Sequence, residues 1–162
     1  MLTCKVVLIT GSAGFIGSSL AKKFLFEGFT VFGVDNINNY YETELKYQRL
    51  KQIENCASIN KRNWKFFKAS IEDESYMEKI FKDCNPDIVV NLAAQAGVRY
   101  SIKHPEKYFK SNLVGFFNIL ELCKKYEIEH LIYASSSSVY GGNKNFPFSE
   151  DQALNNPMSF YA

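Results

Sequence analysis

Short apolar runs alternate with longer amphipathic stretches along the chain. The runs are rich in β-branched and aromatic residues, as is typical of strands buried on both faces of a parallel sheet. Between them, apolar residues recur at helical spacing, which predicts helices that pack one face on the sheet. The five predicted strands are residues 6–10, 30–34, 64–69, 88–92 and 131–134.

The predicted helices lie at 16–28, at about 42–55, around 76–81 and at 104–126. This alternation of strand and helix is typical of an α/β fold, a doubly wound parallel sheet with right-handed crossovers. We expect residues 1–162 to form one domain, since a chain of this length buries about 70% of its unfolded surface. The last segment, from Pro147 to Ala162, has little periodicity and is predicted to be a loop.

The helix predicted at 104–126 is more broadly apolar than the others. Its predicted apolar face carries Phe109, Leu113, Phe116, Leu120 and Cys123, and Val114 and Phe117 widen it. A helix with so wide an apolar face has to be covered on more than one side. One side is predicted to pack on the sheet, and the other is a candidate contact in a homodimer.

Composition and charge limit the possible partners. With 19 basic and 17 acidic side chains the formal net charge is +2, so no strong attraction to nucleic acid or to a membrane surface is expected. No apolar run reaches the roughly 18 residues of a membrane span, and Gly11 and Ser12 interrupt the first one, which argues against a signal peptide. A cytoplasmic protein is therefore expected. The four cysteines are widely separated and lack nearby histidines, so reduced thiols and no metal site are expected.

The first apolar run ends in a loop with Gly11, Gly14 and Gly17 at a spacing of three. Such a triplet is weak evidence alone, but a strand precedes it and a helix follows it. This arrangement directs free backbone N–H groups and the positive end of the helix dipole at one point, where a pyrophosphate can bind. Glycine is needed because a Cβ would obstruct the turn, the phosphate or the helix packing.

The second apolar run ends in Asp35, eighteen residues after Gly17. This is near the offset of about 20 residues at which a carboxylate accepts hydrogen bonds from the adenosine ribose of a dinucleotide. Because a carboxylate there repels a 2′-phosphate, NAD is predicted in preference to NADP. The alternative is an ordinary strand–helix–strand unit in which Asp35 only caps a helix.

The later strands are followed by segments that suit a ligand site. Small residues at 93–97 follow the fourth strand, where they let the backbone approach a ligand at the carboxyl edge of the sheet. Serines at 135–138 follow the fifth strand; taken alone, they are as typical of a flexible loop. His104 and His130 have no neighbours that would complete a catalytic triad.

These motifs together resemble those of the extended short-chain dehydrogenase/reductase family, and the resemblance covers the whole chain. Within that family the chain is most similar to nucleotide-sugar epimerases of the UDP-glucuronate 4-epimerase type. The narrower likeness depends on residues 35–41, 93–101 and 135–141. The family motifs, in order, are Thr10-Gly11-x-x-Gly14-x-x-Gly17, Asp35, Leu92-Ala93-Ala94, Ser136 and Ser159-Phe160-Tyr161-Ala162.

The resemblance implies an NAD-binding Rossmann fold and a specific chemistry. In the family, a tyrosine takes the proton from the sugar C4 hydroxyl while hydride passes to NAD, and the 4-keto sugar then receives hydride on its other face. Tyr161 matches this tyrosine, and Ser136 matches the serine that hydrogen-bonds the reacting oxygen. The residues matched to the cofactor are Gly11, Ala13, Gly14, Phe15, Ile16, Gly17, Asp35, Asn36, Ser70, Ile71, Leu92, Ala93, Ala94 and Asn112.

The substrate implied by the resemblance is UDP-glucuronate, interconverted with UDP-galacturonate for surface polysaccharide. The residues matched to it are Gln95, Arg99, Ser135 and Ser137. For Arg99, a contact to a phosphate or to the sugar carboxylate and a salt bridge at the start of a helix are both open.

The chain departs from the family pattern at its end. A lysine four residues after the tyrosine, the last strands and the substrate domain would all lie beyond Ala162, so residues 1–162 alone are expected to be inactive. Ser70 stands where the family usually has an aspartate near the adenine, which is expected to weaken cofactor binding. One alternative function is a sugar-nucleotide 4,6-dehydratase, although those relatives have Thr-Asp-Glu in place of the serines at 136–138. The other is a non-catalytic NAD-binding fragment.

Overall fold

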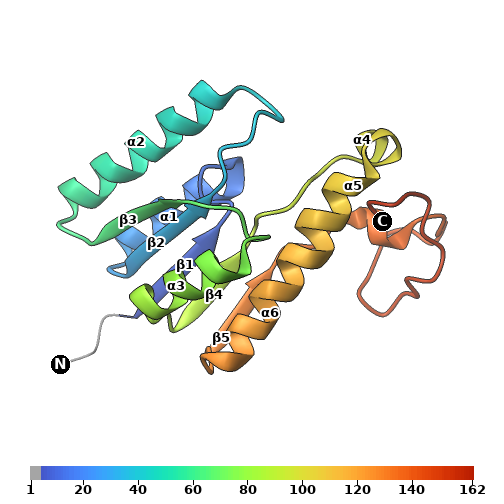
Figure 1. Cartoon of the computed structure of the whole chain (residues 1–162). Helices are drawn as coiled ribbons and strands as arrows, with labels where there is room; N and C mark the ends of the chain where they lie inside the picture. The colour runs from blue at the N-terminus through green and yellow to red at the C-terminus, as the bar shows by residue number, and fades with distance from the viewer. Residues whose placement is uncertain (1–4) are drawn as a thin grey trace.

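A computed structural model describes residues 5–162, which form a five-stranded parallel sheet with helices on both faces (Figure 1). Cys4, one of the cysteines expected to be reduced, lies outside the described residues. The strand order is β3-β2-β1-β4-β5, which confirms the predicted doubly wound sheet. The strands are β1 (Val6–Thr10), β2 (Thr30–Asp35), β3 (Trp64–Lys68), β4 (Ile88–Asn91) and β5 (His130–Tyr133).

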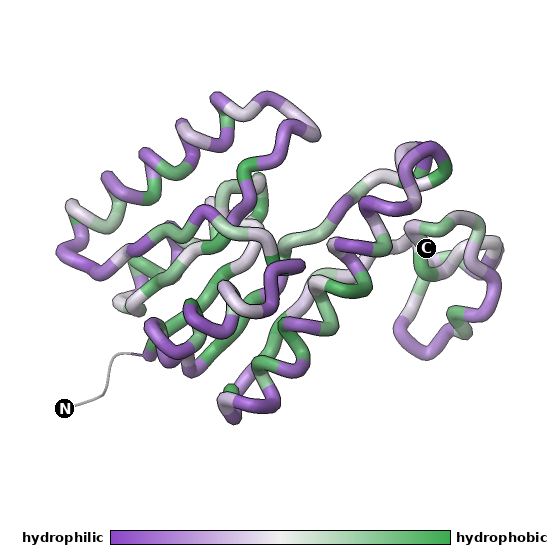
Figure 2. Tube along the Cα trace, in the orientation of Figure 1, coloured by the Kyte–Doolittle hydropathy of each residue, from purple (hydrophilic) through white to green (hydrophobic). Residues whose placement is uncertain are grey.

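Two hydrophobic cores lie on opposite faces of the sheet. Successive residues of a strand point to opposite faces, so Val7 and Ile9 belong to one core and Leu8 to the other. The first core packs against α1 and α2, and the second packs against α3 and α6. These helices are α1 (Phe15–Phe26), α2 (Thr43–Ile59), α3 (Glu74–Cys84) and α6 (Phe116–Lys125). Figure 2 shows the central strands as mainly hydrophobic, as expected for strands covered on both faces.

The order of the strands reverses at the centre of the sheet. The chain runs outward from β1 through β2 to β3 and then returns to β4 on the other side of β1. Thr10, the last residue of β1, is therefore paired with Val34 of β2 and with Asn91 of β4. A ligand site is expected in the crevice outside the carboxyl ends of the strands at such a reversal.

The helix predicted at 104–126 is present, but it is not a regular α-helix. It consists of α5 (Pro105–Tyr108), a π-helical stretch (Phe109–Gly115) and α6, and a short helix α4 (Val98–Lys103) that was not predicted precedes it. A π-helix closes its hydrogen bonds one residue later than an α-helix, so the side chains beyond it change face.

The predicted apolar face of this helix is therefore confirmed only in part, because Cys123 is buried whereas most of the residues expected on that face are exposed. The side chains in the core are those of Tyr108, Ile119, Leu122 and Cys123, and Phe116 is half-buried. Of the residues expected on the apolar side, five are exposed, and we refer to them as the apolar stripe: Phe109, Leu113, Val114, Phe117 and Leu120.

The cysteines in the described part of the chain are free thiols, as expected. Cys84 and Cys123 are buried, and burial raises the pKa of Cys84 to about 12 and that of Cys123 to about 11. Both thiols are therefore protonated and unreactive at neutral pH. The segment after Pro147 forms turns and bends without a helix, which confirms the predicted loop. Within residues 5–162, none of the helices combines the length and the apolar character needed to cross a membrane.

Candidate functional site

The glycine loop connects β1 to α1 and lies against the end of β4. Gly11 adopts a φ of +69°, and a Cβ there would come within 2.8 Å of the backbone N of Ala93. Gly14 donates its N–H to the Gly11 carbonyl over 3.0 Å and forms the N-cap of α1. The first N–H groups of a helix have no acceptor within it, so this turn can bind an anion, as the sequence predicted.

Thr10 fastens the ends of the two central strands to each other. Its buried hydroxyl donates to the Asn91 side-chain oxygen over 2.6 Å and accepts the N–H of Ala93 at 3.1 Å. The loop after β4 is thereby held beside the glycine loop.

Asp35 lies where the predicted dinucleotide site requires a carboxylate. It is buried at the end of β2, and it accepts hydrogen bonds from the N–H of Ala13 at 3.2 Å and from that of Ile37 at 2.9 Å. The alternative in which Asp35 caps a helix does not hold, because α2 begins only at Thr43. Ala13 is buried beneath the carboxylate, whereas Phe15 and Ile16 project into solvent from the start of α1.

Most of the predicted cofactor residues line one pocket, which we call the glycine-loop pocket. Lys46, from α2, also lies in it and was not predicted, because a lysine in a polar helix gives no signal in the sequence. The lining residues are Gly11, Gly14, Val34, Asp35, Asn36, Asn38, Tyr40, Tyr41, Lys46, Ala69, Ser70, Ile71, Leu92, Ala93, Ala94, Gln95 and Ser111.

Both predicted catalytic residues line a second pocket, which we call the serine–tyrosine pocket. Ser136 and Tyr161 reach it from segments twenty-five residues apart in the sequence. Ala93 and Ala94 line both pockets, so the two adjoin. The residues of the serine–tyrosine pocket are Asn91, Ala93, Ala94, Asn112, Phe116, Tyr133, Ala134, Ser135, Ser136, Val139 and Tyr161.

Ser136 is fixed by a turn of 3-10 helix that follows it (Ser137–Tyr140). Its hydroxyl oxygen accepts the N–H of Ser138 at 3.2 Å and thus caps the turn. Ser135 lines the serine–tyrosine pocket with Ser136, whereas Ser137 is not among the residues that line it. The serine run is therefore a structured turn, although its composition alone is as typical of a flexible loop.

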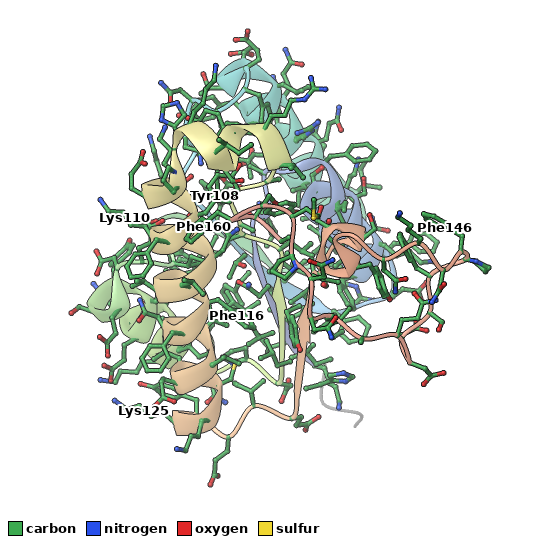
Figure 3. The ribbon with its side chains drawn as sticks, turned by 90° about the vertical axis from the view of Figure 1, so that its right-hand side faces the viewer. Tyr108, Lys110, Phe116, Lys125, Phe146 and Phe160 are labelled. Carbon is green, nitrogen blue, oxygen red and sulfur yellow. The ribbon has the colours of Figure 1, made fainter. Side chains whose placement is uncertain are left out.

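Tyr161 is held by two residues that the sequence analysis missed. Its backbone N–H donates to the hydroxyl of Ser101 at 3.3 Å, and its ring meets the ring of Tyr108 edge-on at 5.8 Å. Tyr108 is fully buried and donates its hydroxyl to the Ala96 carbonyl over 2.7 Å. Burial raises the pKa of Tyr108, so its hydroxyl keeps its proton at neutral pH. In the view of Figure 3, the last segment of the chain, which carries Phe160, reaches α5, the helix that ends at Tyr108.

Asn112 positions the loop after β4. Its side chain accepts the N–H of Gln95 at 2.7 Å and donates to the Gln95 carbonyl over 2.9 Å. Asn112 lies in the π-helical stretch, and such stretches occur frequently at functional sites. It lines the serine–tyrosine pocket, whereas Gln95 is buried and lines the glycine-loop pocket.

Arg99, predicted to contact the substrate, lines neither of these two pockets. It lines a shallow depression with Tyr40, Val98, Tyr100 and Lys103, and this depression adjoins the glycine-loop pocket at Tyr40. Within residues 5–162 it forms no ion pair with a carboxylate, so the salt bridge considered for it is not seen there.

The strand order, the glycine loop and the carboxylate at the end of β2 define a dinucleotide-binding α/β domain. The chain belongs to the family described as GDP-mannose 4,6 dehydratase, whose model matches residues 8–162. Protein CapI of Staphylococcus aureus is 54% identical to it over 156 residues, which cover 96% of this chain and 45% of that protein. The probable UDP-glucuronate 4-epimerase of Rhizobium meliloti (strain 1021) is 42% identical over 156 residues, which cover 96% and 44%. The chain thus spans about half the length of the curated relatives it matches.

Solved structures of similar proteins have the same fold. The UDP-glucose 4-epimerase of Bifidobacterium longum, crystallised with NAD+ and UDP, gives a TM-score of 0.82 at 29% identity over 97% of this chain and 44% of that one. The UDP-glucose 4-epimerase of Thermotoga maritima, solved with UDP-glucose, gives 0.81 at 36% identity over 96% and 46%. The predicted Rossmann fold and the resemblance to the nucleotide-sugar epimerases are thereby confirmed.

Proposed function

We propose that residues 1–162 are the cofactor-binding half of an NAD-dependent nucleotide-sugar 4-epimerase that acts on UDP-glucuronate. The observation that carries this proposal is the adjacency of the two pockets. The glycine-loop pocket suits a dinucleotide, and it shares Ala93 and Ala94 with the pocket that contains Ser136 and Tyr161. A cofactor bound in the first pocket would reach the second across two small side chains.

The residues of the glycine-loop pocket fit NAD. Gly11 and Gly14 leave the loop without side chains where the pyrophosphate would lie, and the first turn of α1 offers N–H donors. Asp35 would accept hydrogen bonds from the adenosine ribose, and Ser70 and Ile71 line the same pocket. When bound, NAD would supply the hydride acceptor for oxidation at the sugar C4.

Tyr161 and Ser136 would act on the C4 hydroxyl itself. As a phenolate, Tyr161 would take the hydroxyl proton, and Ser136 would donate a hydrogen bond to the same oxygen. Ser101 and Tyr108 support this role because they hold Tyr161 at the pocket.

The names of the relatives favour UDP-glucuronate as the substrate. The Rhizobium relative and one from Arabidopsis thaliana are both named as UDP-glucuronate 4-epimerases. UDP-galacturonate would then be the product, for use in polysaccharide synthesis. The cysteines within residues 5–162 are free thiols, which supports a cytoplasmic location.

A 4,6-dehydratase is the second candidate, because the family description names one. Elimination of water requires an acid and a base near the sugar. Ser137 and Ser138 stand where dehydratases have those groups, and hydroxyls are poor substitutes for carboxyl groups in proton transfer. The epimerase is therefore favoured.

Calorimetric titration of the purified chain with NAD, followed by incubation with UDP-glucuronate, tests the proposed function. We expect saturable binding of one NAD per chain. No binding by a chain that circular dichroism shows to be folded would contradict the proposal. UDP-galacturonate among the products would support the epimerase directly. Binding of NAD without product would limit the proposal for residues 1–162 to cofactor binding, and epimerisation would then require a protein of the relatives' length.

We also propose that the apolar stripe is a homodimer contact. Its five side chains form a row along the helix, and an exposed patch of this kind marks an interaction surface. Phe117→Glu would place a charge in the row, so we expect a dimer for the unchanged chain and a monomer for the variant in analytical ultracentrifugation. Lys51→Glu, on an exposed residue of α2, which covers the opposite face of the sheet, is the matched control and should remain a dimer. A monomeric unchanged chain would refute the contact.

A further inference from the structure

Tyr40 connects the two loops that border the glycine-loop pocket. Parallel strands end at one edge of a sheet, so the loop after β2 (residues 36–42) and the loop after β4 (residues 92–97) leave the same edge (Figure 1). The Tyr40 hydroxyl crosses between them and donates to the Ala96 carbonyl over 3.0 Å. Residues of both loops line the pocket, and Tyr40 is one of them. This hydrogen bond therefore joins two walls of the pocket.

The surroundings of the Tyr40 side chain favour this bond. Its ring lies 5.0 Å from the ring of Tyr100, which belongs to α4. Gly97 has a φ of +104°, and a Cβ there would come within 2.8 Å of the Tyr40 hydroxyl oxygen. Tyr108 donates to the same Ala96 carbonyl over 2.7 Å, and a carbonyl oxygen can accept two hydrogen bonds. The acceptor is thus held in place by a second, buried tyrosine.

The loop after β2 can move without disturbing the core. Of residues 36–42, only Ile37 is buried, and the others are exposed. The N–H groups of Asn38 and Tyr40 donate to asparagine side chains of the same loop over 3.0 and 3.3 Å, so the loop stabilises its own shape. Among the described residues, the Tyr40 hydroxyl makes the one hydrogen bond between this loop and residues 92–97. Breaking that bond would let the two loops separate.

We propose that Tyr40 is a latch on the cofactor pocket, that is, a side chain whose bond to Ala96 has to break before the dinucleotide enters or leaves. This inference rests on the proposed function. NAD would extend from Asp35, at the end of β2, to Ala93 and Ala94, after β4, and would therefore lie between the two loops that the latch joins. A 4-epimerase uses NAD as oxidant and then as reductant in one turnover, so slow exchange of the cofactor is compatible with its chemistry.

The test measures how fast the cofactor enters and leaves. Stopped-flow fluorescence of NADH, the reduced cofactor, gives the association rate constant, and displacement of bound NADH by excess NAD gives the dissociation rate constant. Tyr40→Phe removes the hydroxyl and keeps the ring. We expect both rate constants to rise by about 3- to 10-fold, the factor that one neutral hydrogen bond is worth, because the latch has to open in both directions. The dissociation constant, which is their ratio, should change by less than about twofold.

This pattern distinguishes a latch from a direct contact. A hydroxyl that only touched the bound cofactor would change the dissociation rate constant alone. A rise in only one rate constant, or no change in a folded Tyr40→Phe chain, would overturn the inference. Tyr126→Phe is the matched control: its hydroxyl donates to Glu78 over 3.3 Å just after α6, at the amino edge of the sheet, so both constants should stay unchanged. No binding of NADH by the folded, unchanged chain would overturn the proposed function together with the latch, whereas binding with unaltered rate constants in the variant overturns the latch alone.

Discussion

Replacing Asp35 by alanine is expected to weaken NAD binding at least about 100-fold. Hydrogen bonds to a charged group contribute about 1.5–3 kcal/mol each, and the ribose would lose two of them. The substitution also removes the acceptor for the N–H groups of Ala13 and Ile37 and leaves Lys46 buried beside no charge. We therefore expect a loss of about 2–3 kcal/mol in the free energy of unfolding. Calorimetric titration and urea denaturation measure the two effects.

Two variants separate binding from stability in this prediction. Asp35→Asn keeps one oxygen as an acceptor, so it should lose less stability while still losing most of the affinity for NAD. Asp87 is the matched control: it accepts the N–H of Val6 at 2.6 Å at the amino end of β1, whereas the glycine loop follows the carboxyl end of that strand. Asp87→Ala should cost about 1–3 kcal/mol of stability and leave NAD binding unchanged. Unchanged NAD affinity in a folded Asp35→Ala chain would refute the role of the carboxylate.

The strands and the doubly wound class of the sheet could be predicted because the signals for them are local. Most strands are short apolar runs, and alternation with helices leaves few topologies for a parallel sheet. The glycine loop and Asp35 were predicted for the same reason. Their spacing along the chain corresponds to one strand, one turn and one helix, so it fixes where these residues lie relative to one another in the structure.

The apolar stripe shows where local periodicity fails. A spacing of 3.6 residues put Phe109, Leu113 and Cys123 on one face, but only Cys123 of these three is buried, because the π-helical stretch changes the spacing between them. No feature of the sequence in this stretch predicts a π-helix. The buried ring of Tyr108 and the amide of Asn112, which both bind the loop after β4, follow the altered geometry.

Other parts of the site depend on contacts between distant segments. Lys46 reaches Asp35 only because α2 folds back over the loop after β2, and Ser101 meets the backbone of Tyr161 across sixty residues. No spacing rule predicts such pairs. The pairing of Ser136 with Tyr161 was inferred from the family resemblance and not from periodicity, and the structure brings both to one pocket.

Gly17→Ala is expected to abolish detectable NAD binding and to destabilise the chain by about 3 kcal/mol, the range of severe overpacking. A Cβ at Gly17 would overlap the Gly11 carbonyl oxygen and would lie 2.9 Å from the Gly11 carbonyl carbon. These neighbours are backbone atoms, so no side chain can rotate away, and α1 would have to separate from the glycine loop. Urea denaturation and NAD titration would measure both effects.

The direction of the stability change in Gly17→Ala distinguishes steric overlap from helix propensity. Within an exposed part of a helix, glycine to alanine stabilises by up to about 1 kcal/mol, so helix propensity alone predicts the opposite change. Ser19→Ala, on the exposed side of the same helix, is the matched control and should gain a few tenths of a kcal/mol with NAD binding intact. A Gly17→Ala chain as stable as the unchanged one would mean that the contact between the start of α1 and Gly11 is looser than this geometry. In that case the anion site attributed to the helix start would lose its support.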